Sequence, residues 1–232
     1  MSISQIIATS RPQVVTTNLV LYLDAYLNIG TGATWNAIVG TNMDLNNSPT
    51  RNPMPTPSIG LDDTQSQSCS NNYAQDLSNW TIESWFQITS SLNNKTTAII
   101  CDQFDLTTYL NYSMGTNNSP TNYNLCIGFF DGSWHNTSGF SPNLNTWYHC
   151  VGTYNGSTLR QYVNGSLNSF TNYVGLSRSG DLGTRIGRRW DGDTSSANFV
   201  AGNISIVRIY TSALTEAQII QNYTAEKSRF GY

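Results

Sequence analysis

The chain has 232 residues, enough for one large all-β domain or two small ones with a substantial core. Charged residues make up only 11% of it, well below the roughly 25% of an average soluble domain. With 38% hydrophobic and 12% aromatic residues, the chain is expected to be globular rather than disordered. The net charge of −3 argues against general nucleic-acid binding, and no apolar run reaches membrane-spanning length.

The first half of the chain alternates between strand-like runs and long polar loops. Residues 1–18 show no secretory signal and are predicted to form an extension or edge segment ahead of a domain at 19–232. A strand is predicted in LVLYLDAYLN at 19–28, followed by an Asn-, Pro- and Ser-rich loop region at 30–78. The alternating run NWTIESWFQIT at 79–89 predicts a strand with one buried face.

The second half contains further strands and the strongest turn signals. Strands are predicted in TTAIICDQF, YNLCIGFFDG, GTRIGRRWDG and GNISIVRIY. Two Asn-Gly pairs, at 155–156 and 164–165, supply the positive φ values that type I′ hairpin turns need. They separate three runs, at 147–154, 158–163 and 166–170, and so predict an antiparallel meander.

Only the C-terminus has a helical pattern. Thr215 precedes Glu-Ala-Gln218, which predicts a capping box with Thr215 as N-cap. Ile219, Ile220 and Tyr223 then recur at helical spacing and are expected to pack on the strands. An all-β sandwich with a short C-terminal helix, from about residue 215, is therefore the predicted architecture.

The four cysteines lie far apart, without the spacing of a zinc site. Cys101 and Cys126 fall in apolar, strand-like runs, so reduced cysteines acting as small core residues are preferred for the set, which also includes Cys69 and Cys150. A disulfide between neighbouring strands stays open as the alternative. Among the arginines, Arg185, Arg188 and Arg189 cluster, and a solvated or paired set is expected.

The ordered motifs WTIESWF, NTWYHCVGTYNGSTLRQYVNG, TRIGRRW and GNISIVRIYTSALTEAQIIQNY resemble laminin-G-like domains of the concanavalin A-like lectin/glucanase superfamily. The resemblance covers about residues 19–225 and implies a jelly-roll sandwich of two curved antiparallel sheets. LVLYLDA and QNYTAEKSRFGY also resemble such domains in virion proteins of tailed phages and marine viruses. One departure is that Ser205 and Ile206 stand where family members often carry acidic residues.

Enzymatic activity is not expected. Glycoside hydrolysis needs two carboxylates that flank the scissile bond, whereas the glutamates here are only Glu83, Glu216 and Glu226. Glu83 lacks a nearby partner in the sequence and is interpreted as a structural carboxylate. His149 and Cys150 are adjacent, so in a strand they point to opposite faces and cannot form a catalytic pair.

A cofactor is not expected, although calcium is left open. Asp191, Asp193 and Ser195 suggest half of a calcium loop, but the tight-turn glycine and the final acid that such a loop needs are missing. Solvated loop acids are the preferred interpretation. The family resemblance keeps four acids open as calcium ligands, namely Asp131, Asp181, Asp191 and Asp193.

Aromatic residues outside the strand pattern predict a glycan-binding site. Tryptophan faces stack on the apolar faces of sugars while polar side chains bind the hydroxyl groups. If the segments FFDGSWHNTSG and RRWDGD converge, one shallow site would contain Trp134, His135, Trp190, Asp191 and Asp193. Taken singly, each tryptophan is slightly more typical of a cap over the sandwich core.

The sequence thus favours a non-enzymatic protein of the virion surface, acting as a capsid decoration, fibre or tail-associated protein. Its expected activity is adhesion to host-surface glycans by many copies or a homo-oligomer. Residues 1–18 are the expected attachment to other virion proteins. The alternative is a cellular carbohydrate-binding module, with calcium dependence left open.

Overall fold

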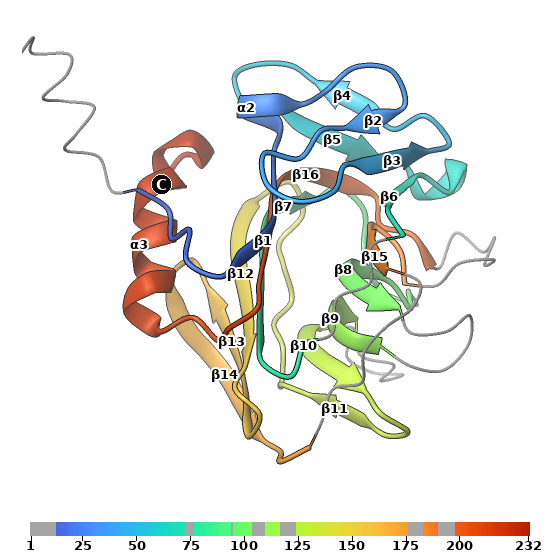
Figure 1. Cartoon of the computed structure of the whole chain (residues 1–232). Coiled ribbons are helices and arrows are strands. Elements are labelled where there is room, and N and C mark those ends of the chain that lie inside the picture. The colour runs from blue at the N-terminus through green and yellow to red at the C-terminus, as the bar shows by residue number, and fades with distance from the viewer. Residues whose placement is uncertain are drawn as a thin grey trace, which may run out of the picture.

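The computed structural model describes residues 13–72, 77–93, 95–103, 110–116, 124–175, 183–189 and 198–232. In this part of the chain, two antiparallel sheets face each other and a C-terminal helix packs on the outer face of one of them (Figure 1). The predicted all-β sandwich with a short terminal helix is confirmed. No helix in the described ranges is long and apolar enough to cross a membrane.

Sheet A is the sheet that carries the helix. Its strand order is β14 (Ser166–Asn172), β13 (Thr158–Val163), β12 (Trp147–Tyr154), β7 (Trp80–Ile88), β16 (Gly202–Tyr210), β5 (Ser58–Leu61) and β4 (Thr50–Asn52), and β1 (Leu19–Asp24) also pairs with β16. The described residues also contain the short helices α2 (Ala25–Asn28), η1 (Asp63–Gln65) and η3 (Lys227–Phe230).

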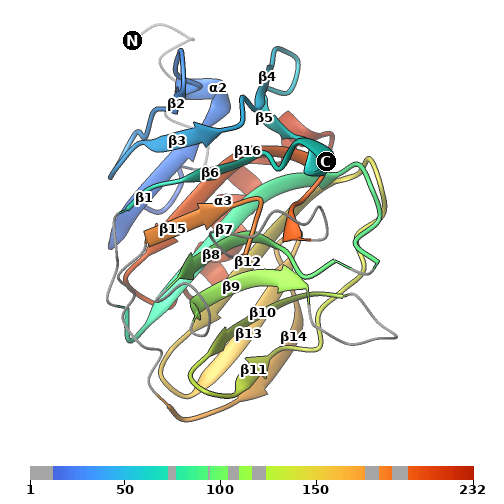
Figure 2. The same cartoon turned by 90° about the vertical axis from the view of Figure 1, so that its right-hand side faces the viewer.

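Sheet B forms the opposite layer, seen from its outer side in Figure 2. Its strand order is β11 (Trp134–Asn136), β10 (Leu125–Phe130), β9 (Leu110–Thr116), β8 (Ala98–Gln103), β15 (Gly183–Ile186), β6 (Ser68–Ser70), β3 (Met43–Asn46) and β2 (Thr34–Trp35). The main core lies between the sheets, where Phe86 from β7 and Ile127 and Phe129 from β10 are fully buried.

Strand β16 holds the N-terminal and C-terminal parts of sheet A together. One of its edges pairs with β7, while the other edge pairs first with β5 and then with β1. The register shifts at Ser205, whose buried hydroxyl donates to the Pro57 carbonyl oxygen at 2.6 Å. At this bulge the strand changes its partner, which is the structural role of a position where acids are common in the family.

The predicted meander is confirmed, but its two turns differ. Asn164 and Gly165 have φ values of 51° and 79°, as a type I′ turn requires. In the first turn only Gly156 has a positive φ, and the Asn155 side chain accepts hydrogen bonds from the amides of residues 157 and 158. This turn is therefore an Asx-type turn rather than the predicted type I′ turn.

Strand β7 is buried on both faces, which corrects the predicted half-buried strand. Ile82 and Phe86 face the inter-sheet core, whereas Trp85 and Glu83 lie on the outer face of sheet A. That face is covered by the C-terminal segment, since the Trp85 ring stacks on Phe230 with centroids 4.0 Å apart. A strand pattern alone does not reveal a cover that comes from another part of the chain.

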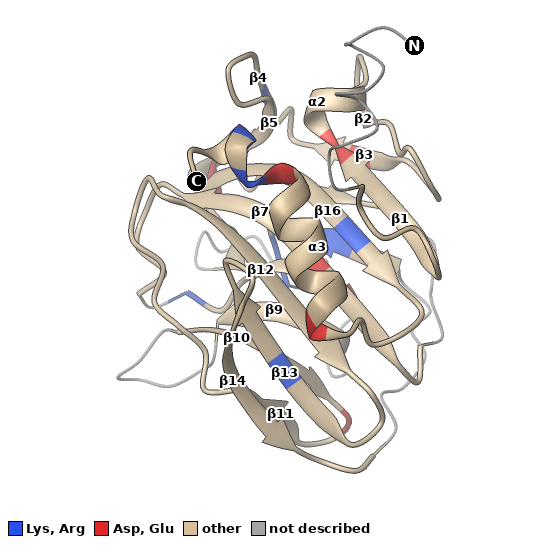
Figure 3. Ribbon diagram, turned by 90° about the vertical axis from the view of Figure 1, so that its left-hand side faces the viewer, with Lys and Arg blue, Asp and Glu red and all other residues tan. Residues whose placement is uncertain are grey.

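Helix α3 (Glu216–Glu226) lies across sheet A, as Figure 3 shows. The capping box of Thr215 and Gln218 is present as predicted. Ile219 is fully buried, but Ile220 is 44% exposed, so the predicted packing of Ile220 is wrong. The buried side of the helix instead carries Asn222 and Glu226, two polar residues.

The residues just before β1 belong to the folded domain. Val15 is buried against Tyr210 and Ile219, and its amide donates to Asn222 Oδ1 at 2.7 Å. The last part of the predicted 1–18 extension is therefore packed under α3, while residues 1–12 lie outside the described residues.

All four cysteines are free and buried, in agreement with the preferred interpretation. Burial raises the pKa of the thiols of Cys69, Cys101 and Cys150 to about 12, so these side chains are neutral at physiological pH.

Candidate functional site

Trp134 and His135 lie in a strand, which corrects the loop position predicted for them. Strand β11 pairs with β10, with Trp134 opposite Phe130 and His135 opposite Phe129. The Asp131 side chain accepts a hydrogen bond from the Ser133 amide at 3.3 Å, which supports the short turn between the strands. The segment reads as a polar loop in the sequence because so few residues separate the two strands.

Trp134 faces outward from sheet B, away from the inter-sheet core. It packs with Phe130, at a ring-centroid distance of 4.9 Å, beside the buried pair Ala98 and Cys101. The Arg189 guanidinium lies 4.3 Å from the centroid of the Trp134 ring, which is a cation–π distance. The Trp134 side chain is half-buried, so part of it remains open to solvent.

Arg189 reaches Trp134 from the segment that follows β15. The Cys101 thiol on β8 donates to the carbonyl oxygens of Arg188 and Arg189 at 3.4 and 3.3 Å, which holds this segment on the outer face of sheet B. Burial lowers the pKa of Arg189 to about 10, so the guanidinium stays charged at neutral pH. Sequence reasoning assigned no separate role to Arg189, although this residue stands directly before Trp190.

The remainder of the predicted glycan site lies outside the described residues, namely Trp190, Asp191 and Asp193. What the structure does show is that Trp134 meets Arg189, the residue before this group. The convergence of Trp134 with Trp190, Asp191 and Asp193 stays a prediction.

His135 points to the opposite side of β11 from Trp134. Its ring stacks on Tyr173, with centroids 3.5 Å apart, and contacts Phe129 of the core. Its Nε2 lies 3.0 Å from Asp131 Oδ1, and the Tyr173 hydroxyl donates to Asp131 Oδ2 at 2.8 Å. The structure thus does not bring His135 and Trp134 into one site, and instead places His135 in a polar cluster that ties β11 to the chain after β14.

Asp131, one of the four candidate calcium ligands, has both carboxylate oxygens engaged in this cluster. Burial would raise the pKa of Asp131, but hydrogen bonds from Tyr173 and His135 outweigh it and hold the pKa below its usual value. Asp181, Asp191 and Asp193 lie outside the described residues. In the described ranges, no three His, Cys, Asp or Glu side chains are grouped as a metal ion would need.

The arginine cluster is less solvated than expected. Arg185 and Arg189 are 3% and 2% exposed, whereas Arg188 is half-buried. The Arg185 guanidinium donates to the carbonyl oxygens of Asn71 and Thr184 at 2.6 and 3.1 Å. Two of the three cations are therefore part of the packed outer layer of sheet B.

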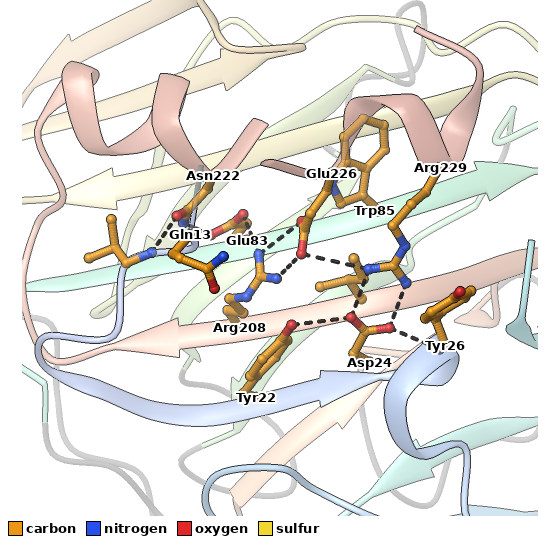
Figure 4. A network of polar contacts seen from close by, with 12 residues as sticks. Gln13, Tyr22, Asp24, Tyr26, Glu83, Trp85, Arg208, Asn222, Glu226 and Arg229 are labelled. Atoms are coloured by element: carbon orange, nitrogen blue, oxygen red, sulfur yellow. Dashed lines mark hydrogen bonds and ion pairs between the residues drawn. The ribbon is translucent and has the colours of Figure 1, made fainter. Parts of the chain in front are cut away.

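A further group of buried charges lies between sheet A and α3 (Figure 4). Arg208 on β16 donates through Nη1 to Glu83 Oε1 at 2.9 Å and also pairs with the Glu226 carboxylate of α3. His149 Nε2 lies 2.9 Å from Glu83 Oε1, and Asn222 donates to Glu83 Oε2 at 2.7 Å. Glu83, Arg208 and His149 have no exposed surface.

The surroundings of Glu83 keep its carboxylate charged. Burial alone would raise the pKa of Glu83, but Arg208, His149 and Asn222 outweigh it and lower the pKa from 4.5 to about 2. A group that is fully buried and ionised throughout the physiological range cannot protonate a leaving group. Glu83 is therefore placed as a structural carboxylate, as its sequence context indicates.

The charged group continues to the end of the chain. Arg229 makes two hydrogen bonds to the Asp24 carboxylate, at 2.8 and 2.6 Å, in the two-pronged geometry typical of strong arginine–carboxylate pairs. Trp85 Nε1 donates to Glu226 Oε2 at 3.1 Å. These contacts join β1, β7 and β16 to the C-terminal helices and so lock the helix onto the sheet.

The fold and the sequence were compared with those of known proteins. The family model of the concanavalin A-like lectin/glucanase superfamily matches residues 62–220. A sequence search against curated proteins finds no relative. Among solved structures, a Trypanosoma rangeli sialidase in complex with sialic acid is similar with a TM-score of 0.64 and 15% identity, over 94% of this chain and 35% of the sialidase.

Domain 4 of an extracellular arabinanase from Geobacillus stearothermophilus, in complex with arabinotriose, is also similar. Its TM-score is 0.62 and its identity 14%, over 90% of this chain and 100% of that domain. The present chain thus spans about a third of the sialidase but the whole of the arabinanase domain. At these identities the likeness shows the shared fold, and the family match covers more than half of the sequence. The chain belongs to the concanavalin A-like lectin/glucanase superfamily.

Proposed function

We propose that this domain is a non-enzymatic glycan-binding module whose binding surface surrounds Trp134 and Arg189 on the outer face of sheet B. The observation that carries the proposal is the stack of Arg189 on Trp134, at 4.3 Å, on a half-exposed part of that face. A tryptophan held in place by a cation offers a rigid apolar edge on which the apolar face of a sugar can pack.

The proposal places the module on the surface of a virion, in many copies, as an adhesion protein. Shallow sugar sites of this kind bind weakly, and many copies on one particle would supply the avidity that a single site lacks. The resemblance of both ends of the domain to phage and marine-virus proteins supports this location.

Absence of catalysis is part of the proposal. Glu83 is the only glutamate in a strand of the sandwich, and it is fully buried in ion pairs with Arg208 and next to His149. Retaining and inverting glycosidases both need a pair of carboxyl groups that contact the scissile bond of the substrate. The buried Glu83 carboxylate cannot contact such a bond.

Glycan-array binding of the purified chain tests the proposal. Trp134→Ala should abolish retention, and Arg189→Ala should weaken it, because the Trp134 ring then loses the cation that holds it in place. Since Arg189 is 2% exposed, the melting temperature of each variant is measured beside its retention. Phe170→Ala serves as the matched control, because Phe170 is a 58% exposed aromatic residue on β14 of the other sheet. If Trp134→Ala unfolds the chain, Trp134→Phe takes its place in the comparison. Normal retention by both folded variants would refute the proposal.

A second candidate is a cellular carbohydrate-binding module attached to an enzyme, and the similarity to a complete arabinanase domain favours it. Mass spectrometry of purified virions separates the two, because only the first places the chain in the particle. Retention on arabinan that is lost on chelation with EDTA, without the chain in virions, would support the second candidate in its calcium-dependent form.

A further inference from the structure

A polar recess lies near the β4 edge of sheet A, where β4, β5 and β16 lie side by side. Its volume is about 210 Å³. It is lined by Thr50, Asn52, Gly60, Leu61, Asp62, Gln67, Thr89, Gly202 and Asn203. None of these residues belongs to the surface around Trp134.

One of the residues that line the recess is Gly60, at the centre of β5. Gly60 is opposite both Asn203 and Thr50 in the sheet. A Cβ atom at Gly60 would lie 2.9 Å from Asn52 Nδ2 and 3.3 Å from Asn203 Oδ1. Since the φ of Gly60 is outside the positive range, the backbone does not demand a glycine here. What the glycine provides is the room in which the two amides stand over β5.

Hydrogen bonds fix the amides that border this space. Asn203 Nδ2 donates to Gln87 Oε1 at 2.9 Å, and Asn52 Nδ2 donates to Asn203 Oδ1 at 2.8 Å and to Ser58 Oγ at 3.1 Å. Both amide hydrogens of Asn52 are therefore used, whereas its Oδ1 remains an available acceptor. One hydrogen of Asn203 Nδ2 remains an available donor.

The chemistry of the lining selects the ligand. Available donors and acceptors stand side by side, which suits adjacent hydroxyl groups, since each hydroxyl both donates and accepts. The lining contains no Lys or Arg, and Asp62 is its only charged residue, which disfavours an anionic ligand. The volume is below the roughly 300–1,000 Å³ of pockets for drug-sized ligands, so it fits one ring.

We propose that this recess is a second binding site, for one neutral sugar ring, held by Asn52 and Asn203 above Gly60. The site does not depend on the Trp134 surface, so either one can fail without the other.

NMR titration of the isotope-labelled full chain with glucose, galactose, mannose and arabinose tests the site. At least one of these sugars should shift the side-chain amide signals of Asn52, Asn203 and Gln87. Gly60→Ala, which fills the space, should weaken that binding at least tenfold. Trp134→Ala should leave the shifts unchanged, which separates this site from the proposed glycan surface.

If Gly60→Ala does not fold, Asn52→Ala, which removes the available acceptor, should weaken binding to a similar extent. The proposal is overturned if none of the four sugars moves these amide signals, or if a folded Gly60→Ala chain binds as well as the unchanged protein. An equal response to glycerol and to the sugars would also overturn it, because no ring would then be recognised.

Discussion

Glu83 shows how a single side chain acquires its role from residues that are remote in sequence. Its carboxylate is held by Arg208, His149 and Asn222, which stand 125, 66 and 139 positions away. The sequence indicates a structural carboxylate, because no acidic partner stands nearby. Its burial and its partners could not be predicted, since they depend on which strands are neighbours and on where the terminal helix lies.

The low pKa of Glu83 makes a prediction about acid stability. Because the folded-state pKa is about 2 and the ordinary value is 4.5, the charged group stabilises the fold above pH 4.5 and loses this effect as the pH falls towards 2. The stabilisation at neutral pH is on the order of 3 kcal/mol. Denaturant unfolding of the unchanged protein and Glu83→Gln should show a difference in the free energy of unfolding that narrows across this pH range.

The other carboxylates of the group, Glu226 and Asp24, are present in both proteins, so the comparison isolates the effect of Glu83. His149, Arg208 and Tyr210 face Glu83 in both as well. A difference that stays constant from neutral pH to pH 2 would show that Glu83 is not charged in the folded state.

The aromatic residues of the predicted glycan site also show that sequence alone does not reveal which side chains become neighbours in the fold. Trp134 was expected near Trp190, and the structure brings it to Arg189, one residue earlier. His135 was grouped with Trp134 because the segment reads as a loop, where neighbouring side chains can converge. In a strand, consecutive side chains point to opposite faces, and that geometry separates them.

At the scale of elements, local signals were the most reliable. The second Asn-Gly turn and the capping box of α3 depend only on residues within a few positions, and both are confirmed. The face that α3 buries was predicted less well, because Asn222 and Glu226 are buried only by virtue of Glu83 and Arg208 on the sheet. Hydrophobic spacing cannot detect a helix face that packs through polar groups.

Two neighbouring isoleucines test how α3 packs. Ile219→Asp places a charge in the buried cluster with Val15 and Tyr210 and should cost about 3 kcal/mol or more. Ile220→Asp introduces the same charge on the 44% exposed neighbour and should change the free energy of unfolding by only about 0.5 kcal/mol. Thermal melting of both variants makes the comparison, and equal destabilisation would mean that the helix does not pack in the orientation described.

At the scale of the whole molecule, the fold class, the family and the order of the strands' motifs could be predicted, because they follow from periodicity and from motifs spread along the chain. The cover of sheet A could not be predicted. It combines residues 13–18 with α3 and η3, which only the folded chain brings together.

The start of the domain can be located by two truncations. Deletion of residues 1–18 removes Val15 from its buried cluster and should lower the melting temperature below that of a chain that lacks only residues 1–12. Incorporation into particles provides a separate measurement, and it should already fail with the shorter deletion if residues 1–12 attach the domain. Equal melting temperatures for both truncations would show that residues 13–18 add nothing to the fold.

The partner change of β16 at Ser205 has a consequence for the order in which the protein can be made. Strands β1, β5 and β7 all leave the ribosome long before β16, yet each of them has an edge that only β16 pairs with. Until residue 210 is available, these edges remain unpaired in a nascent chain, and unpaired edges invite association with other chains. We therefore expect the sandwich to close only once residue 210 has been made, at the slow rate typical of folds built on distant strand pairs.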